Sequence, residues 1–151
     1  MVNPKTKGAS GEREIADDLN YIVYSLMKEL GYENPTMSSI QRNQNQSAVG
    51  GADLTGTFGL CIEVKRQEAL SVNTWWQQAT ASAQRRNETP VLLYRQNGKK
   101  WHCVLMVAVP IGPNGVHGYM HVRADMDYDS FKAWFKQWAA SAMNNGWEIK
   151  V

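Results

Sequence analysis

Residues 60–67 have the sequence LCIEVKRQ, an apolar segment from which the prediction of the fold starts. Its apolar residues are interrupted by Glu63 and Lys65, which lie two positions apart. Side chains of a β-strand alternate between its two faces, so Glu63 and Lys65 point to one face while Ile62 and Val64 point to the other. The segment is therefore predicted to be a buried strand that carries an acid and a base side by side.

Length and composition predict one globular domain spanning residues 1–151. The chain contains six Trp and has a formal net charge of +2, which favours a packed core over disorder. Cys61 and Cys103 lie in apolar segments and are expected to be buried thiols rather than a disulfide. The N-terminus lacks an apolar signal core, and no segment is long enough to cross a membrane. A cytoplasmic protein with no membrane partner is expected, in a microbial or virus-infected cell.

The N-terminal part has the pattern of one helix followed by strands. Apolar residues recur at three- and four-residue steps across residues 10–30, which predicts a helix with Ser10 as its N-cap and Gly31 as its stop. Residues 36–42 are predicted as a strand and residues 43–51 as a polar loop. Residues 52–58 and 60–65 are predicted as two strands joined by a tight turn at Phe58-Gly59.

The C-terminal part alternates between helices and strands. Residues 71–87 and 127–143 have helical patterns, and residues 90–95 and 101–109 are apolar strands around a turn at Asn97-Gly98. Residues 111–118 are predicted as a loop, and residues 147–151 as an edge strand. The order implies an α/β fold with a mixed central β-sheet flanked by helices.

Three acidic residues are expected to converge. Asp53 lies in the strand before the turn, Glu63 lies in the returning strand, and adjacent strands bring such residues within side-chain reach. Glu12 can join them from the first helix. Because three neighbouring carboxylates repel one another, a hard cation such as Mg²⁺ is expected between them. Lys65 is placed to orient or deprotonate an attacking water, or to neutralise the charge on the reacting phosphate.

Asp53, nine intervening residues and then Glu63-Val64-Lys65 resemble the signature of the PD-(D/E)XK nuclease superfamily, although Ala52 replaces its proline. A lone Glu-x-Lys also occurs by chance on surface hairpins. The segment KGASGEREI, residues 7–15, resembles the N-terminus of archaeal-type Holliday junction resolvases. The resemblance implies a restriction-endonuclease-like core, a single nuclease domain, and a catalytic acid at Glu12. It covers about the first two thirds of the chain.

The resemblance also implies a metal site and a DNA-binding surface. Glu12, Asp53, Glu63 and the Val64 carbonyl would hold Mg²⁺, for which Mn²⁺ can substitute, and Lys65 completes the catalytic set. Basic clusters are often only solvated surface. Ser47 is the nearest match to a loop serine that approaches the junction. The candidate DNA-binding residues are Lys7, Arg13, Arg42, Ser47, Arg66, Arg85 and Arg86.

The predicted function is a metal-dependent endonuclease that resolves four-way DNA junctions. Two alternatives stay open: another PD-(D/E)XK nuclease, directed to ends or to a recognition sequence, and a nucleic-acid-binding module without catalysis. A homodimer is expected because a four-way junction presents two strands related by approximate two-fold symmetry. Aromatic residues, Trp75, Trp76, Trp134, Phe135 and Trp138, are the candidates for its interface.

Overall fold

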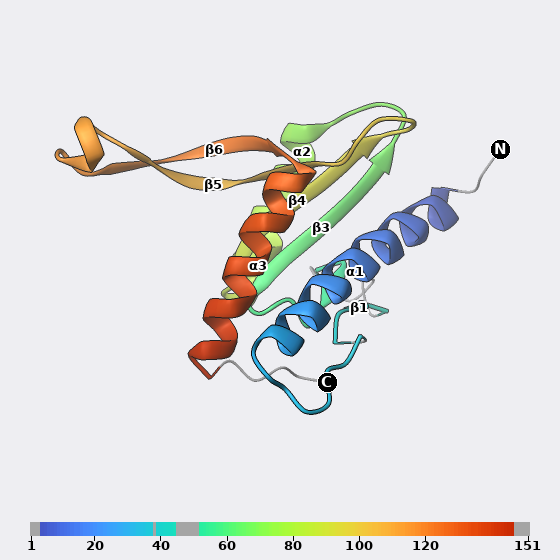
Figure 1. The fold of residues 1–151 in the computed structure, drawn as a ribbon. Coiled ribbons are helices and arrows are strands. Elements are labelled where there is room, and N and C mark those ends of the chain that lie inside the picture. Colours follow the sequence, from blue (N-terminus) through green and yellow to red (C-terminus); the bar gives the residue numbers. More distant parts are fainter. Residues whose placement is uncertain (1–3, 38, 45–51, 147–151) are drawn as a thin grey trace.

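The computed structural model describes residues 4–37, 39–44 and 52–146 (Figure 1). Its helices are α1 (Pro4–Glu29), α2 (Val72–Arg86) and α3 (Tyr128–Asn144), with a short 3-10 helix at Pro113–Gly115. Its strands are β1 (Gln41–Arg42), β2 (Leu54–Thr55), β3 (Leu60–Gln67), β4 (Thr89–Gln96), β5 (His102–Pro110) and β6 (Tyr119–Asp127).

The central sheet has four strands in the order β3-β4-β5-β6. Strands β3 and β4 are parallel and are connected through α2, whereas β4–β5 and β5–β6 are antiparallel. Strands β1 and β2 form a small antiparallel pair. The predicted α/β fold, a mixed central sheet flanked by helices, is confirmed.

The two faces of β3 meet different helices, as its alternation requires. Ile62 and Val64 belong to the main core, in which Phe131 and Phe135 of α3 and the apolar stripe of α1 pack against the sheet. The opposite face of the sheet is covered by α2, where Trp75 contacts residues of β4 and β5. Helices α1 and α3 therefore share one face of the sheet, and α2 covers the other (Figure 1).

The first strand is much shorter than predicted. Residues 36–42 contain only the two-residue strand β1, because the backbone of Ile40 is bonded to a helix instead of a strand. The Ile40 N–H donates to Asn20 Oδ1 at 2.8 Å, and Asn20 Nδ2 donates to the Ile40 carbonyl at 2.8 Å. The side chain of Asn20 on α1 thus takes the place of the backbone hydrogen bonds that a neighbouring strand would form with Ile40.

Strand β6 was not predicted from the sequence. Met120, Val122, Ala124 and Met126 alternate with polar residues, but the segment lies between a loop and a helix and carries several charges. Its pairing with β5 along nine residues makes it a strand. The first helix also begins earlier than predicted, at Pro4 rather than Ser10. Residues 147–151, the predicted edge strand, lie outside the described residues.

The turn at Phe58-Gly59 is present, but the strand predicted before it is shorter and has a different partner. Phe58 and Gly59 both have positive φ, at 56° and 84°, as in a tight turn. The predicted strand 52–58 contains only β2, which pairs with β1 and not with β3. Cys61 and Cys103 are free and buried. No helix among the described residues is long and apolar enough to cross a membrane.

Candidate active site

Asp53 is fixed against β3 by its backbone and by its side chain. Its N–H donates to the Ile62 carbonyl at 2.9 Å. Its Oδ2 accepts a 2.7 Å hydrogen bond from the Val64 N–H. Strand β3 pairs with β4 along its other edge, so the Asp53 carboxylate takes the place of a strand partner here. This register brings Asp53 next to Glu63, as predicted.

Glu63 and Lys65 lie on the face of β3 opposite the main core. Lys65 Nζ is 4.0 Å from Glu63 Oε2, and the side chain of Lys65 remains partly exposed while that of Glu63 is buried. The parallel register pairs these residues with Leu92 and Tyr94, which pack under α2. The acid and the base therefore lie side by side at the edge of the sheet, next to Asp53.

Glu12 reaches the site from α1 and is also buried. Its Oε2 accepts a 2.6 Å hydrogen bond from Arg42 Nε on β1. Strand β1 pairs with β2 so that Arg42 faces Leu54, the residue after Asp53. Arg42 was predicted from the sequence to bind DNA. Its ion pair with Glu12 was not predicted, because the two residues are thirty positions apart.

The three carboxylates influence one another electrostatically. Burial raises the pKa of Asp53 well above its ordinary value, and the negative charges of Glu63 and Glu12 raise it further. Burial also raises the pKa of Glu63, although the positive charge of Lys65 opposes that rise. Such a set stores unfavourable charge energy that a cation would relieve.

The carboxylates of Asp53, Glu63 and Glu12 have the chemistry of ligands for a hard divalent cation, but their arrangement does not form a complete site. Oxygen donors on buried, mutually repelling carboxylates are the ligands that Mg²⁺ takes. Within the described residues, however, no group of three or more His, Cys, Asp and Glu side chains has an arrangement that could hold a metal ion. The carboxylate of Glu12 is bound by Arg42. Asp53 and Glu63 are thus adjacent buried carboxylates, and the carboxylate of Glu12 is paired with the guanidinium of Arg42.

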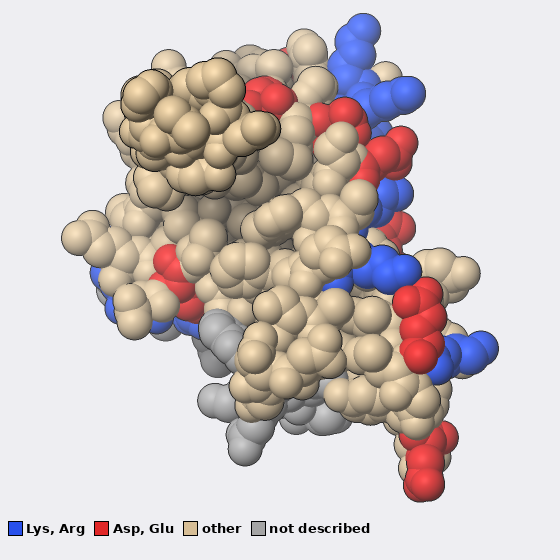
Figure 2. Space-filling model, turned by 60° about the vertical axis from the view of Figure 1, so that its left-hand side comes forward, with Lys and Arg blue, Asp and Glu red and all other residues tan. Residues whose placement is uncertain are grey.

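Two of the predicted DNA-binding residues, Arg13 and Arg42, lie near Glu12. Arg13 and Arg42 line a hollow of about 300 Å³ between α1 and β1, together with Asp17, Gln41 and Gln44. In the view of Figure 2, blue and red side chains are mixed along one edge of the molecule. Arg42 also pairs with Glu12, so both arginines lie in the neighbourhood of this carboxylate.

The remaining basic residues lie on α1, β3 and α2. Arg66 is half-buried on the face of β3 that meets α1, near Gly11. Arg85 and Arg86 are exposed in the last turn of α2, where Arg86 pairs with Glu88. Lys7 lies in α1, and its side chain is not described. Ser47 lies outside the described residues.

One basic residue of this region was missed by the sequence analysis. Arg95 stands beside Arg66 in the parallel register of β3 and β4. Its guanidinium lies over the ring of Trp101 at 5.5 Å and within 3.4 Å of Glu14 Oε1. The signal was present in the sequence, since both parallel strands have Arg-Gln as their last two residues. Parallel strands place such ends at the same edge of a sheet, where ligands of α/β proteins bind.

The chain is similar to known proteins in sequence and in structure. A family model described as "Phage putative PDDEXK endonuclease" matches residues 3–132. Among solved structures, the chain resembles Hjc of Archaeoglobus fulgidus, a Holliday junction resolvase from an archaeal hyperthermophile, with a TM-score of 0.45 and 13% sequence identity. That similarity covers 82% of this chain and 97% of the other. No match was found in the search of curated proteins.

Proposed function

Because the chain belongs to the phage PD-(D/E)XK endonuclease family, we propose that it is a divalent-metal-dependent DNA endonuclease that resolves four-way junctions. The observation that carries the proposal is the position of the Asp53 carboxylate. It is held at 2.7 Å by the Val64 N–H, next to the buried Glu63 and its neighbour Lys65. Metal ligands beside a positively charged side chain are a combination that can catalyse phosphodiester hydrolysis.

Asp53, Glu63 and Glu12 are the proposed protein ligands of Mg²⁺, with Mn²⁺ as a substitute. When bound, the ion supplies positive charge at the scissile phosphate and acidifies water beside it. The Val64 carbonyl is a further proposed ligand. The N–H and C=O of one strand residue point to the same side, and the Val64 N–H points toward Asp53.

Lys65 is the proposed group that acts on the water and on the reacting phosphate. Its side chain is partly exposed and lies 4.0 Å from Glu63 Oε2, so the ammonium group can reach outward while its stem packs against the sheet. There it would orient the attacking water by a hydrogen bond and stabilise the charge that develops on the phosphate oxygens.

Arginines near the carboxylates are the proposed contacts to the DNA backbone. Arg13 and Arg42 line the hollow beside Glu12, and Arg66 and Arg95 stand together at the ends of β3 and β4. Such contacts fix the position of DNA without reading its sequence. Lys7, Ser47, Arg85 and Arg86 complete the proposed set.

The substrate and the oligomeric state are the finer parts of the proposal. The segment with Glu12 resembles archaeal-type junction resolvases, and a junction has two strands to cut. A two-fold homodimer supplies two sites for them. The most direct experiment incubates the protein with a labelled four-way junction and with a linear duplex of the same sequence, each with and without Mg²⁺.

The proposal expects paired nicks in the junction only when Mg²⁺ is present, and little cleavage of the duplex. The matched control is Asp53→Asn, which keeps an oxygen for the Val64 N–H but removes a charge. This variant should bind the junction and not cut it. Equal cleavage of junction and duplex would favour another nuclease of the same superfamily, and binding without any cleavage would favour a non-catalytic module.

A further inference from the structure

Among the described residues, several of the most exposed apolar side chains lie on the outer part of the β5–β6 ribbon. Strand β4 pairs with β5 only as far as Val104, whereas β5 and β6 stay paired out to Pro110 and Tyr119. Beyond the sheet they form a two-stranded ribbon that projects from the body (Figure 1). Residues 107–122 of this ribbon are called the arm below.

The arm contains no Asp, Glu, Lys or Arg. In Figure 2 it comes toward the viewer as a tan surface. Contacts to nucleic acid depend on cationic side chains that neutralise phosphates, so the composition of the arm argues against a phosphate backbone as its partner. An uncharged arm fits an apolar protein surface.

One face of the arm continues the hydrophobic core. Leu105 is buried in the main core and Val107 packs against that core. By alternation and register, Val109, Met120 and Val122 follow on the same face. Helix α3 covers only the inner part of this stripe. Val109 and Met120 are 38% and 55% exposed, so a face with core composition is left uncovered in one copy of the chain.

Such an arm gains from being covered. A two-stranded ribbon is only marginally stable in water by itself, whereas packing against a helix stabilises it. The five aromatic residues predicted for an interface offer less exposed surface than the arm. Trp75 and Phe135 are buried, and Trp76, Trp134 and Trp138 are half-buried against the chain's own core. The exposed apolar surface of the arm is therefore the stronger candidate for a contact between copies.

The chain also carries a groove that fits an uncharged occupant. A hollow of about 400 Å³ between α1 and α3 is lined by Tyr21, Ile22 and Ala133 together with Asp18, Lys132 and Lys136. Tyr21 is 64% exposed. The apolar part of this lining has no covering element among the described residues.

Each charged side chain of the groove already has a partner within the chain. Asp18 accepts a hydrogen bond from the Tyr128 hydroxyl at 2.7 Å. Lys132 lies 3.5 Å from Asp129, and Lys136 lies 3.0 Å from Glu29. An occupant therefore need not bring charges of its own, which matches the arm.

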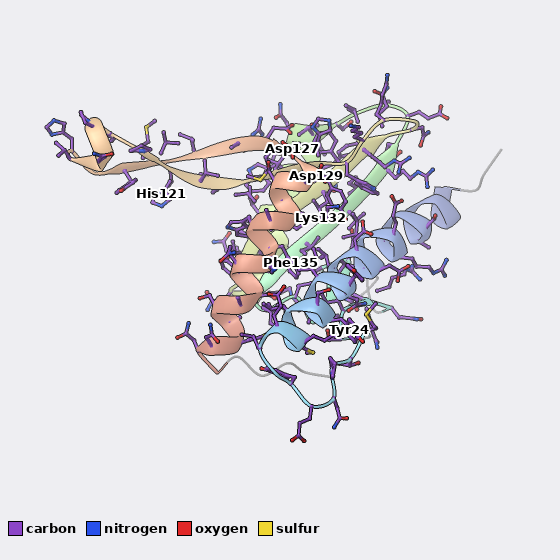
Figure 3. The ribbon with its side chains drawn as sticks, in the orientation of Figure 1. Tyr24, His121, Asp127, Asp129, Lys132 and Phe135 are labelled. Carbon is purple, nitrogen blue, oxygen red and sulfur yellow. The ribbon has the colours of Figure 1, made fainter. Side chains whose placement is uncertain are left out.

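The arm cannot fill the groove of its own chain. Figure 3 labels His121 on the arm and Lys132 on α3, and the arm points away from the side of α3 that faces α1. We propose that the arm of one copy packs its Val109 and Met120 face into the α1–α3 groove of a second copy, and that the second copy does the same in return. The contact occurs twice in a two-fold dimer. This inference rests on the homodimer of the proposed function and adds where the copies touch.

The first test measures the oligomeric state by sedimentation at micromolar concentrations. The double variant Val109→Ser/Met120→Ser should weaken the dimer about tenfold or more, because it removes two apolar contacts at each of two symmetric sites. The matched control is Ala108→Ser/His121→Ser on the opposite face of the same arm, which should leave the dimer unchanged. Circular dichroism and melting temperature establish that both variants are folded.

The second test locates the contact by cross-linking. Cys61 and Cys103 are buried, so an introduced cysteine on the surface reacts alone. Protein with Met120→Cys mixed with protein with Ala133→Cys should form a disulfide-linked heterodimer on mild oxidation. Neither protein oxidised alone should do so to the same extent.

Several results would overturn the inference. A monomeric wild type would overturn both the dimer and the arm contact, while leaving nuclease activity to be judged by the cleavage assay. A dimer that tolerates Val109→Ser/Met120→Ser would overturn the arm contact alone. Self-linking of Met120→Cys without linkage to Ala133→Cys would overturn the groove as the partner surface. Loss of DNA binding with an intact dimer would assign the arm to DNA.

Discussion

Arg42 Nε lies 2.6 Å from Glu12 Oε2, so an arginine is the immediate partner of one of the three clustered carboxylates. Both side chains are largely withdrawn from water, which strengthens the pair relative to an exposed one. A guanidinium at this place offsets negative charge that would otherwise build up beside Asp53 and Glu63. If Glu12 binds Mg²⁺ as proposed, Arg42 competes with the ion for this carboxylate.

Replacing Arg42 should therefore make the melting temperature depend more strongly on Mg²⁺. Arg42→Gln should lower the melting temperature in chelator by a few degrees, because about 1 kcal/mol shifts it by about 2–4 °C in a chain of this size. Added Mg²⁺ should raise the melting temperature of the variant more than that of the wild type, since Glu12 is then free to bind the ion. Differential scanning calorimetry with and without Mg²⁺ measures both effects. Lys99→Gln, at an exposed turn, is the control; equal Mg²⁺ shifts in all three proteins would contradict the competition.

Asp53 should destabilise the metal-free fold at neutral pH. Its pKa in the folded state is raised by burial and then by Glu63, so the fold disfavours the ionised form. The penalty is absent below the unfolded-state pKa, near 3.8, and grows as the pH rises above it. In chelator, Asp53→Asn should melt a few degrees above the wild type at pH 7, and the difference should vanish near pH 4.

Mg²⁺ should reverse this order at pH 7, because the wild type gains a bound cation and the variant loses a ligand. Asp129→Asn provides the control, since the Asp129 side chain is 94% exposed. If Asp53→Asn melted below the wild type in chelator at pH 7, the charge repulsion inferred for this site would be wrong.

Lys65 should act on turnover more than on binding. Lys65→Ala should slow junction cleavage by about 10²-fold or more, a common effect of removing an acid–base or charge-stabilising group. Junction affinity should change much less. Single-turnover cleavage and gel-shift titration measure the two quantities, with Lys100→Ala at the exposed β4–β5 turn as control. A loss of affinity with normal cleavage of bound DNA would make Lys65 a backbone contact.

Binding to DNA should weaken steeply with salt, and Arg13 should account for part of that slope. Arg13 is exposed beside the hollow that contains Arg42. Arg13→Ala should reduce the slope of log affinity against log salt by about 1 and weaken binding equally across sequences. Fluorescence anisotropy between about 50 and 200 mM salt measures this slope. Lys28→Ala, exposed in the last turn of α1, is the control. An unchanged slope for Arg13→Ala would remove Arg13 from the DNA surface.

The sequence by itself determined the local features of this protein. Strict alternation in residues 60–67 predicted β3 and placed Glu63 and Lys65 on one face, and the helical periods predicted α2 and α3 almost to the residue. Turn residues such as Gly59 and Gly98 marked the strand connections. These features depend on neighbours within a few positions, so the order of residues is enough to specify them.

Only the tertiary structure decided which distant groups meet. The Asn20 side chain forms hydrogen bonds with the backbone of Ile40, which ends the strand there, and Arg42 pairs with Glu12. No pattern of neighbouring residues in the sequence indicates either contact. Strand β6 exists because β5 offers it a partner along its whole length. Contacts of this kind depend on how helices and strands pack in three dimensions, and the hydrophobic period of a single segment contains no information about the segment it will meet.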